Sequence, residues 1–114
     1  MKNVYTWAAR PAKRNITVGD IIAAKGKKIL TQVTANTMLE AKAAEEAGFD
    51  MIIGSASKVK EVREGSKILF YTAALELHNY PTPEDVLRGA FKALENGADA
   101  VMTARSMDVV SMLA

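Results

Sequence analysis

Polar side chains that could bind an anion, hold a metal ion or move a proton occur at the ends of four apolar segments of this 114-residue chain. The four groups are Thr34 and Asn36, then Ser55, Ser57 and Lys58, then Thr72, Glu76 and His78, and finally Thr103, Arg105 and Ser106. If the segments are strands of a barrel-type parallel sheet, their carboxyl ends lie together, where such folds carry their active sites. We therefore expect these groups to meet.

Glu76 and His78 are the pair that could perform acid–base chemistry. Side chains two residues apart on an extended strand project to the same side, so this carboxylate and the chain's single imidazole could act as acid and base. Glu76 is also the candidate metal ligand. The competing interpretation is a polar loop that leads into the next helix, because Glu-x-His is a common sequence.

Arg105 is the main candidate for binding a carboxylate or a phosphate, because a guanidinium presents a planar fork of donors. An exposed loop arginine without a function is the alternative. Ser55 and Ser57 come directly after a strand, where backbone N–H groups could cradle an anion. Thr34 and Thr103 add hydroxyl groups at the ends of two other strands, and we expect all five residues to bind substrate.

A repeat in the sequence predicts the elements that would position these groups. Residues 44–53 and 93–102 both read as the end of an amphipathic helix, a glycine, a short turn and an apolar strand, with Gly48 matching Gly97 and Asp50 matching Asp99. Such a repeat marks a repeated supersecondary unit. Alternating helices and strands predict a parallel sheet with crossover helices.

The apolar runs predict strands over residues 29–35, 51–54, 67–73 and 100–103. Helices are expected over 17–25, from Asn36 or Thr37 to about Ala47, from Thr82 to Gly97, and from about Met107. The charged run 58–64 is expected to be a solvated helix face. Residues 1–15 are expected to be an extended arm that orders where Trp7 finds a surface, and residues 16–114 to be one α/β domain.

Composition excludes several classes of protein. The net charge of +2 comes from scattered side chains and gives no reason to expect nucleic acid as a partner. No apolar run is long enough to cross a membrane, and the first residues lack the apolar core of a secretory signal. The chain has no cysteine, so no disulfide framework is expected. We expect a cytoplasmic protein.

An ordered set of short motifs resembles one enzyme family. The set consists of residues 17–21 (TVGDI), 31–35 (TQVTA), 44–53 (AEEAGFDMII), 82–84 (TPE) and 96–101 (NGADAV). Together they resemble the N-terminal half of the ketopantoate hydroxymethyltransferase family of the phosphoenolpyruvate mutase superfamily. The resemblance implies half of a (β/α)₈ barrel, Mg²⁺ as cofactor, a small 2-oxo acid as substrate, and a role in pantothenate biosynthesis.

The family's metal carboxylates are replaced at the matched positions. Ser55 stands where the family has an aspartate after the second strand, and Ala74 stands where a second aspartate follows the third strand. Met102 and Ala104 replace a lysine and a glutamate at the fourth strand. Three interpretations therefore stay open: a hydroxymethyltransferase-like enzyme acting on or binding a 2-oxo acid, a non-catalytic half-barrel, and an anion-binding oligomeric αβ protein.

Four strands are half of an eight-stranded barrel, which would leave both edges and one face of the sheet uncovered. Val33, Ile52, Leu69, Tyr71 and Val101 are the residues expected on that face. We expect a homodimer, or a larger even-numbered oligomer, in which the first or the fourth strand pairs across chains. A doubly wound sheet with helices on both faces is the alternative for a monomer.

Overall fold

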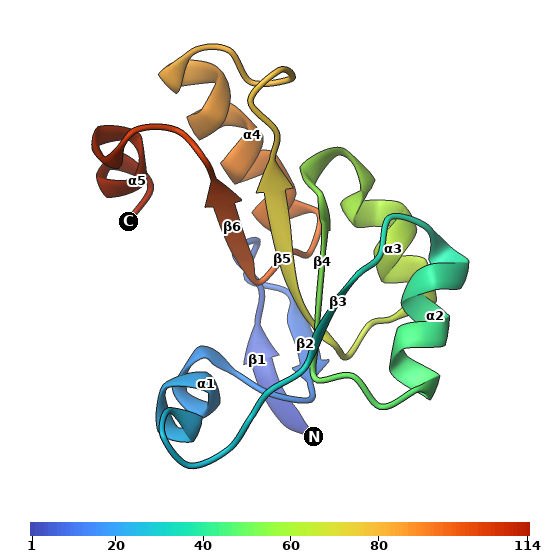
Figure 1. Ribbon diagram of the computed structural model, residues 1–114. Coiled ribbons are helices and arrows are strands. Elements are labelled where there is room, and N and C mark those ends of the chain that lie inside the picture. The colour runs from blue at the N-terminus through green and yellow to red at the C-terminus, as the bar shows by residue number, and fades with distance from the viewer.

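Four parallel strands form the central sheet of the computed structural model, which describes all of residues 1–114 (Figure 1). They lie in chain order, and every neighbouring pair is parallel. The strands are β3 (Gln32–Thr34), β4 (Met51–Ser55), β5 (Phe70–Leu75) and β6 (Ala100–Thr103). The helices are α1 (Val18–Ala24), α2 (Met38–Glu46), the 3-10 turn η1 (Ala56–Lys58), α3 (Val59–Gly65), α4 (Pro83–Glu95) and α5 (Met107–Leu113). The predicted α/β architecture with four sequential parallel strands is confirmed.

Two strands begin later than the apolar pattern predicted. Ile29 is 90% exposed and lies in the connection before β3. The third predicted strand runs from residue 70 to 75 rather than from 67 to 73. The residues before it are held by other parts of the chain, since the Asn15 N–H donates to the Ile68 carbonyl over 2.8 Å and the Leu69 N–H donates to the Ser66 hydroxyl over 3.2 Å.

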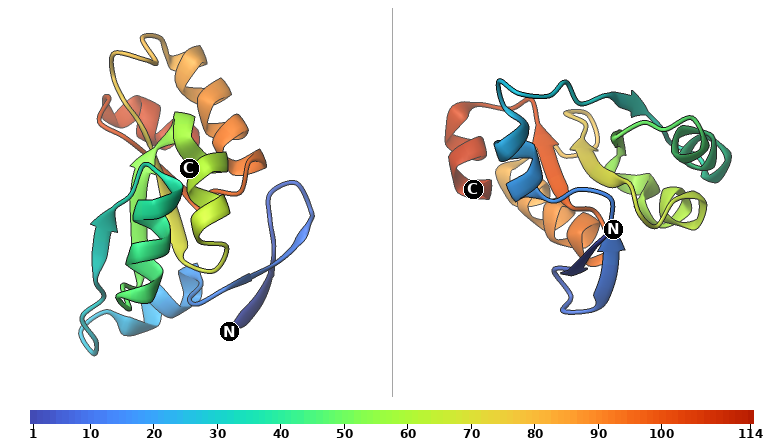
Figure 2. Two further views of the ribbon diagram at one scale, coloured as in Figure 1. Left: turned by 90° about the vertical axis from the view of Figure 1, so that its right-hand side faces the viewer. Right: turned by 90° about the horizontal axis from the view of Figure 1, so that it is seen from below.

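The helices that follow β3, β4 and β5 all cover the same face of the sheet (Figures 1 and 2). Alternate strand residues on this face, including Ile52, Tyr71, Ala73 and Leu75, join one buried cluster with apolar residues of α2, α3 and α4. Tyr71 and Ile52 have no exposed surface. A doubly wound sheet would place helices on both faces, so the arrangement is instead consistent with half of a barrel.

The opposite face of the sheet, which we name the open face, carries no such layer. Its residues are Gln32, Thr34, Met51, Ile53, Ser55, Thr72, Ala74, Ala100 and Met102, and none of them is buried. Phe70 has the same orientation but is only 5% exposed, because the amino-terminal segment lies over it.

The residues predicted to lie on the uncovered face of the sheet were therefore the wrong ones. Val33, Ile52, Tyr71 and Val101 point to the helices, and Leu69 lies in the buried cluster. Successive strand residues point to opposite faces, so an error of one residue exchanges the two faces completely. Apolar residues occur on both faces of this sheet, and hydrophobicity alone does not say which face the helices cover.

The first fifteen residues, expected as an extended arm, fold back on themselves. Strands β1 (Lys2–Tyr5) and β2 (Pro11–Arg14) pair antiparallel, and Ala9 in the turn has a positive φ of 59°. Trp7 in this turn meets Phe91 of α4, with ring centroids 5.4 Å apart. The hairpin and α1 lie toward the amino ends of the parallel strands (Figure 1).

The two matched aspartates of the repeat make equivalent hydrogen bonds. Asp50 accepts hydrogen bonds from the N–H and hydroxyl of Thr31, at 2.8 and 3.2 Å, just before β3. Asp99 accepts from the Tyr71 N–H at 3.0 Å at the start of β5. In both copies the carboxylate after the helix and turn therefore fixes the amino end of the preceding parallel strand.

None of the helices is long and apolar enough to cross a membrane.

Candidate functional site

A polar hollow of about 350 Å³ lies where β3, β4 and β5 end, at the edge of the open face. We name it the strand-end hollow. Its lining residues are Thr34, Asn36, Ile53, Gly54, Ser55, Lys58, Ala74 and Glu76. Three of the predicted site residues, Thr34, Ser55 and Glu76, are thus brought together at the carboxyl ends of the strands, where a barrel carries its chemistry.

The peptide at the end of β4 is fixed from both sides. The side-chain carbonyl of Asn36 accepts a hydrogen bond from the Ser55 N–H over 2.7 Å, and the Tyr71 hydroxyl donates to the Ser55 carbonyl over 3.0 Å. Gly54 approaches so closely that a Cβ there would collide with the Ala35 carbonyl oxygen. The Ser55 hydroxyl accepts a hydrogen bond from the Ser57 N–H over 3.2 Å, which holds it in a defined position beside the hollow.

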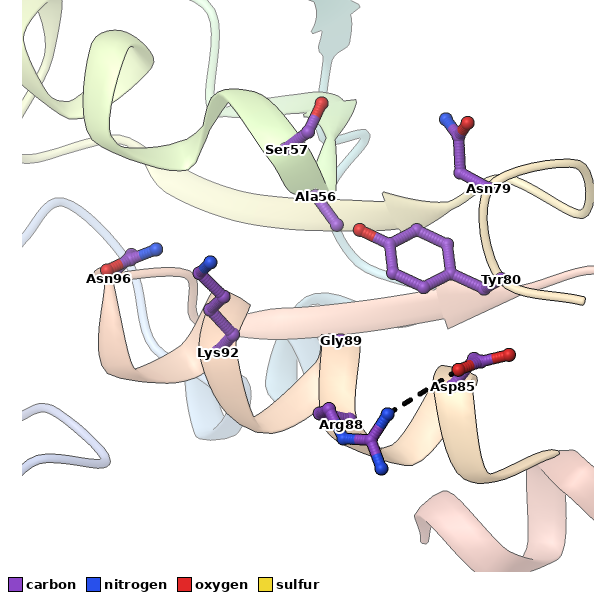
Figure 3. A pocket seen from close by; sticks show the side chains of 9 residues that line it. All are labelled: Ala56, Ser57, Asn79, Tyr80, Asp85, Arg88, Gly89, Lys92 and Asn96. Carbon is purple, nitrogen blue, oxygen red and sulfur yellow. Dashed lines mark ion pairs between the residues drawn. The ribbon is translucent and has the colours of Figure 1, made fainter. Parts of the chain in front are cut away.

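Ser57 lies on the other side of this segment. Its hydroxyl is 2.8 Å from that of Ser55, but it lines a separate groove of about 350 Å³ between η1 and α4. Figure 3 shows that groove, with the Tyr80 side chain reaching between Ala56 and Gly89 and the Arg88–Asp85 ion pair below it. Ser57 therefore contacts the strand-end hollow only through Ser55.

Glu76 and His78 are not presented as a strand pair. Strand β5 ends at Leu75, and residues 77–79 form a turn in which the Asn79 and Tyr80 N–H groups both donate to the Glu76 carbonyl at 3.2 Å. The condition under which both side chains would share one face, an extended strand through residue 78, is not met, because the strand stops before them. The alternative interpretation, a polar loop that leads into the next helix, describes this segment. His78 is exposed and does not line the hollow, whereas Glu76 does.

The Glu76 carboxylate is stabilised in its charged form. Partial burial acts to raise its pKa, but hydrogen bonds from Ser55 and Asn79 and the nearby His78 outweigh this effect, so the pKa of Glu76 lies below its usual value. The Asn79 amide donates to the carboxylate over 3.2 Å. Glu76 is thus a fixed negative charge at the rim of the hollow at neutral pH.

Thr103 ends β6 and Arg105 follows it, at the opposite edge of the sheet from β3, and neither lines the strand-end hollow. Arg105 Nε donates to the Tyr80 carbonyl over 3.2 Å, and one Nη donates to the Pro81 carbonyl. Its backbone N–H donates to the Thr103 hydroxyl over 3.3 Å. Within one chain, Arg105 thus fastens the loop that leads into α4.

Lys58 supplies the positive charge of the hollow. Its ammonium is 3.9 Å from the Glu61 carboxylate, and 52% of its side chain is exposed. Such a loose surface pair contributes little and can be exchanged for another anion. Lys58 and Asn36 were both among the polar residues expected at the strand ends, and this position, three residues after Ser55 and two after Thr34, is the sequence signal that identifies them.

The magnesium site implied by the resemblance does not fit these residues. Glu76 is the only carboxylate that lines the hollow, and the ammonium of Lys58 lines the same space. Nowhere in the chain do three or more histidine, aspartate or glutamate side chains converge as metal ligands. Mg²⁺ takes oxygen ligands, with carboxylates as its protein anchors, and the two-carboxylate set of the family has no counterpart here.

A buried ionic cluster at the other end of the sheet was not foreseen as a unit. Arg14 Nε lies 2.9 Å from both carboxylate oxygens of Asp99, and Arg63 Nη2 lies 2.8 Å from one of them. Burial lowers the pKa of Arg63 to about 10, against the opposing effect of Asp99. The guanidinium groups also donate to the carbonyls of Gly97, Leu69 and Lys67. This cluster joins the hairpin to α3 and β5, and its role is structural.

Comparison with known proteins shows a distant similarity to an enzyme. No family model matches the chain. The chain is 28% identical over 120 residues to the 3-methyl-2-oxobutanoate hydroxymethyltransferase of Kosmotoga olearia, and the match covers 86% of this chain and 45% of the relative. The chain therefore spans about half the length of the curated relative that it matches. The resemblance read from the motifs is thus supported as a distant similarity to 3-methyl-2-oxobutanoate hydroxymethyltransferase.

Proposed function

We propose that this chain binds a small 2-oxo acid, such as 3-methyl-2-oxobutanoate, in the strand-end hollow, and that by itself it catalyses no efficient hydroxymethyl transfer. The observation that carries the proposal is the hollow itself, which combines a loosely paired ammonium with hydroxyl and amide groups at the carboxyl ends of parallel strands. The name of the distant relative contains this oxo acid, and we choose the substrate class of the proposal on that basis.

The donors suit a carboxylate beside a ketone. Lys58 offers an ammonium to the carboxylate, while the Thr34 hydroxyl can donate to the keto oxygen. Ile53 and Ala74 line the same hollow and offer apolar contact to the alkyl part of the acid. Glu76 on the rim repels a second negative charge, so a monoanion should bind better than a dicarboxylate.

Catalysis is a separate matter. The family's reaction relies on a metal held by carboxylates, and Ser55 and Ala74 offer none at the matched positions. Glu76 and His78 remain candidate catalytic groups, and Thr103 and Arg105 candidate substrate ligands, but only Glu76 lines the hollow. A role in pantothenate biosynthesis is part of the proposal and depends on the oxo acid being the ligand.

Isothermal calorimetry with 3-methyl-2-oxobutanoate tests the proposal. We expect saturable binding that does not depend on Mg²⁺ and that Lys58→Met weakens about fivefold, which corresponds to ~1 kcal/mol for a partly exposed charge pair. Lys60→Met is the matched control, because Lys60 is exposed on α3 and does not line the hollow.

Three results would contradict the proposal. Equal loss in both lysine variants would mean that only general electrostatic attraction is measured. Robust Mg²⁺-dependent hydroxymethyl transfer by the pure chain would show that the carboxylates needed for metal binding lie elsewhere, with Glu76 as the first residue to substitute. An absence of any saturable binding would instead favour the non-catalytic half-barrel.

A further inference from the structure

The open face and the two open edges of the sheet leave this chain with more exposed surface than its size requires. The exposed surface is 7090 Å², whereas a compact monomer of 12.3 kDa is expected to expose about 6,100 Å². Parallel sheets occur almost only with both faces covered. The excess of roughly 1,000 Å² per chain would give about 2,000 Å² for a pair, which is the size of an obligate homodimer interface.

The open face is chemically suited to meet a copy of itself. It has apolar side chains at Met51, Ile53 and Met102, the neutral amide of Gln32, small neutral residues at the other positions, and no charged residue. Two such faces can therefore be brought together without placing like charges opposite each other. Met102 is 45% exposed in the single chain and would gain the most from being covered.

The two edge strands of the sheet, β3 and β6, both have free backbone N–H and C=O groups that could pair with each other across two chains. The Ala35 N–H donates to the Ile53 carbonyl and the Thr31 carbonyl accepts from Met51, so residues 31 and 35 face β4. Backbone groups alternate in direction along a parallel strand, and the N–H and C=O groups of Gln32 and Thr34 consequently face the open edge. β6 has a free edge of the same kind on the other side of the sheet.

The helices beside these edges carry exposed apolar side chains as well. Met38 and Leu39 of α2, beside β3, are 41% and 70% exposed, and Val110 and Met112 of α5, beside β6, are 37% and 43% exposed. Between β6 and α5 lies an apolar hollow of about 310 Å³. Figure 1 shows α2 and α5 at opposite edges of the sheet, where α2 of one copy would meet α5 of the other.

We propose that two copies of this chain close into one eight-stranded barrel, with β6 of each copy pairing in parallel with β3 of the other around a two-fold axis along the strands. Closing the barrel removes both edges and covers both open faces. It also brings Thr103 and Arg105 of the second copy beside Thr34 and Asn36, at the border of the strand-end hollow. This last step rests on the proposed function, whereas the assembly does not.

The native mass tests the assembly directly. Light scattering during gel filtration at micromolar concentration should give twice the chain mass of 12.3 kDa. Met102→Lys should weaken the dimer at least about 100-fold, because each interface would bury an unpaired ammonium. Leu77→Lys is the matched control, since Leu77 is 49% exposed in the turn after β5, away from the edges and the open face. A well-folded wild-type monomer would overturn the proposal.

A spin label separates the proposed pairing from other dimers. The chain has no cysteine, so Ala104→Cys, at an exposed position just after β6, gives a single attachment site for a nitroxide. In a mixture of labelled chains and ¹⁵N-labelled wild-type chains, we expect interchain broadening at the amides of Thr34 and Asn36. Broadening confined to β6 would mean that β6 pairs with itself, and this result would refute the barrel.

Ligand binding then distinguishes the two proposals. If the second copy borders the hollow, Met102→Lys should weaken binding of 3-methyl-2-oxobutanoate while Leu77→Lys should not. Unchanged affinity in a monomeric Met102→Lys protein would show that the hollow works within one chain, which would refute the shared border while leaving the barrel dimer in place. A dimer that binds no oxo acid would count against the proposed function alone.

Discussion

Replacing Asp99 by asparagine should destabilise this protein far more than most single substitutions. The Asp99 carboxylate accepts from Arg14 at 2.9 Å, from Arg63 at 2.8 Å and from the Tyr71 N–H at 3.0 Å. The side chains of the two arginines are only 5% and 10% exposed. Asparagine keeps the shape but removes the negative charge, so two buried guanidinium groups would face each other without a counterion.

The expected cost follows from that geometry. Removing one partner of a buried ion pair costs about 3–5 kcal/mol, because the remaining charge stays desolvated. A small domain has about 5–15 kcal/mol of stability in total, so the Asp99→Asn protein should unfold at much lower urea concentration or fail to fold. Urea unfolding followed by circular dichroism measures the difference, and the hairpin should lose its protection against amide exchange first.

Asp50→Asn is the matched control. Asp50 holds the equivalent place in the sequence repeat and binds the N–H and hydroxyl of Thr31, but no arginine approaches it and its bonds are exposed. We expect a loss of about 1 kcal/mol there, as for ordinary hydrogen bonds. If Asp99→Asn cost no more than Asp50→Asn, the buried cluster would not hold the hairpin and β5 together, and the reasoning would be refuted.

Two other predictions concern the segment behind the strand-end hollow. Burial raises the pKa of Tyr71 from 10.0 to about 12. The stability that this shift contributes is complete below pH 10 and is lost as the pH rises to about 12, on the order of 2–3 kcal/mol in all. Tyr71→Phe should flatten this alkaline decline in stability, whereas Tyr5→Phe should not, since Tyr5 is 76% exposed. Gly54→Ala should destabilise the fold by about 2–3 kcal/mol, because the added Cβ would collide with the Ala35 carbonyl. Gly19→Ala is the control and should be neutral or stabilising, because a Cβ there meets only the Thr17 hydroxyl at 3.6 Å. Thermal unfolding of the two variants measures the difference.

The helix ends and the strand order could be predicted from the sequence. Thr17 and Thr82 cap their helices together with Asp20 and Asp85, and both helices begin where the sequence placed them. The repeat around Gly48 and Gly97 gave the helix–turn–strand units. Both glycines have positive φ angles, 85° and 115°, which other residues rarely adopt. Short-range chemistry was sufficient in these places.

The facing of the strands could not be predicted in the same way. Apolar residues lie on both faces of the sheet, so the alternation that identifies the buried side of an antiparallel strand is missing. Ile52 and Ile53 are equally apolar, yet the first is fully buried beneath the helices and the second lines the hollow. Which of them faces the helices depends on how the helices pack, and that is a long-range property.

The candidate site was predicted in part. Thr34, Ser55 and Glu76 meet because the carboxyl ends of neighbouring parallel strands coincide, which the strand order implies. His78 lies outside the hollow because the backbone turns after Leu75, which agrees with the alternative of a polar loop before the next helix. Arg105 could be placed after β6 but not given its partners, since these are backbone carbonyls on a loop 24 or 25 residues earlier in the chain.

The most direct test of the proposed binding site is a ¹⁵N NMR titration of the chain with 3-methyl-2-oxobutanoate in the absence of added metal. The account predicts saturable shifts centred on the amides of Asn36, Ser55 and Lys58, which surround the strand-end hollow. Shifts centred instead on Tyr80 and Lys92, in the groove between η1 and α4, would contradict the assignment of the site. An unchanged spectrum at millimolar oxo acid would contradict binding altogether.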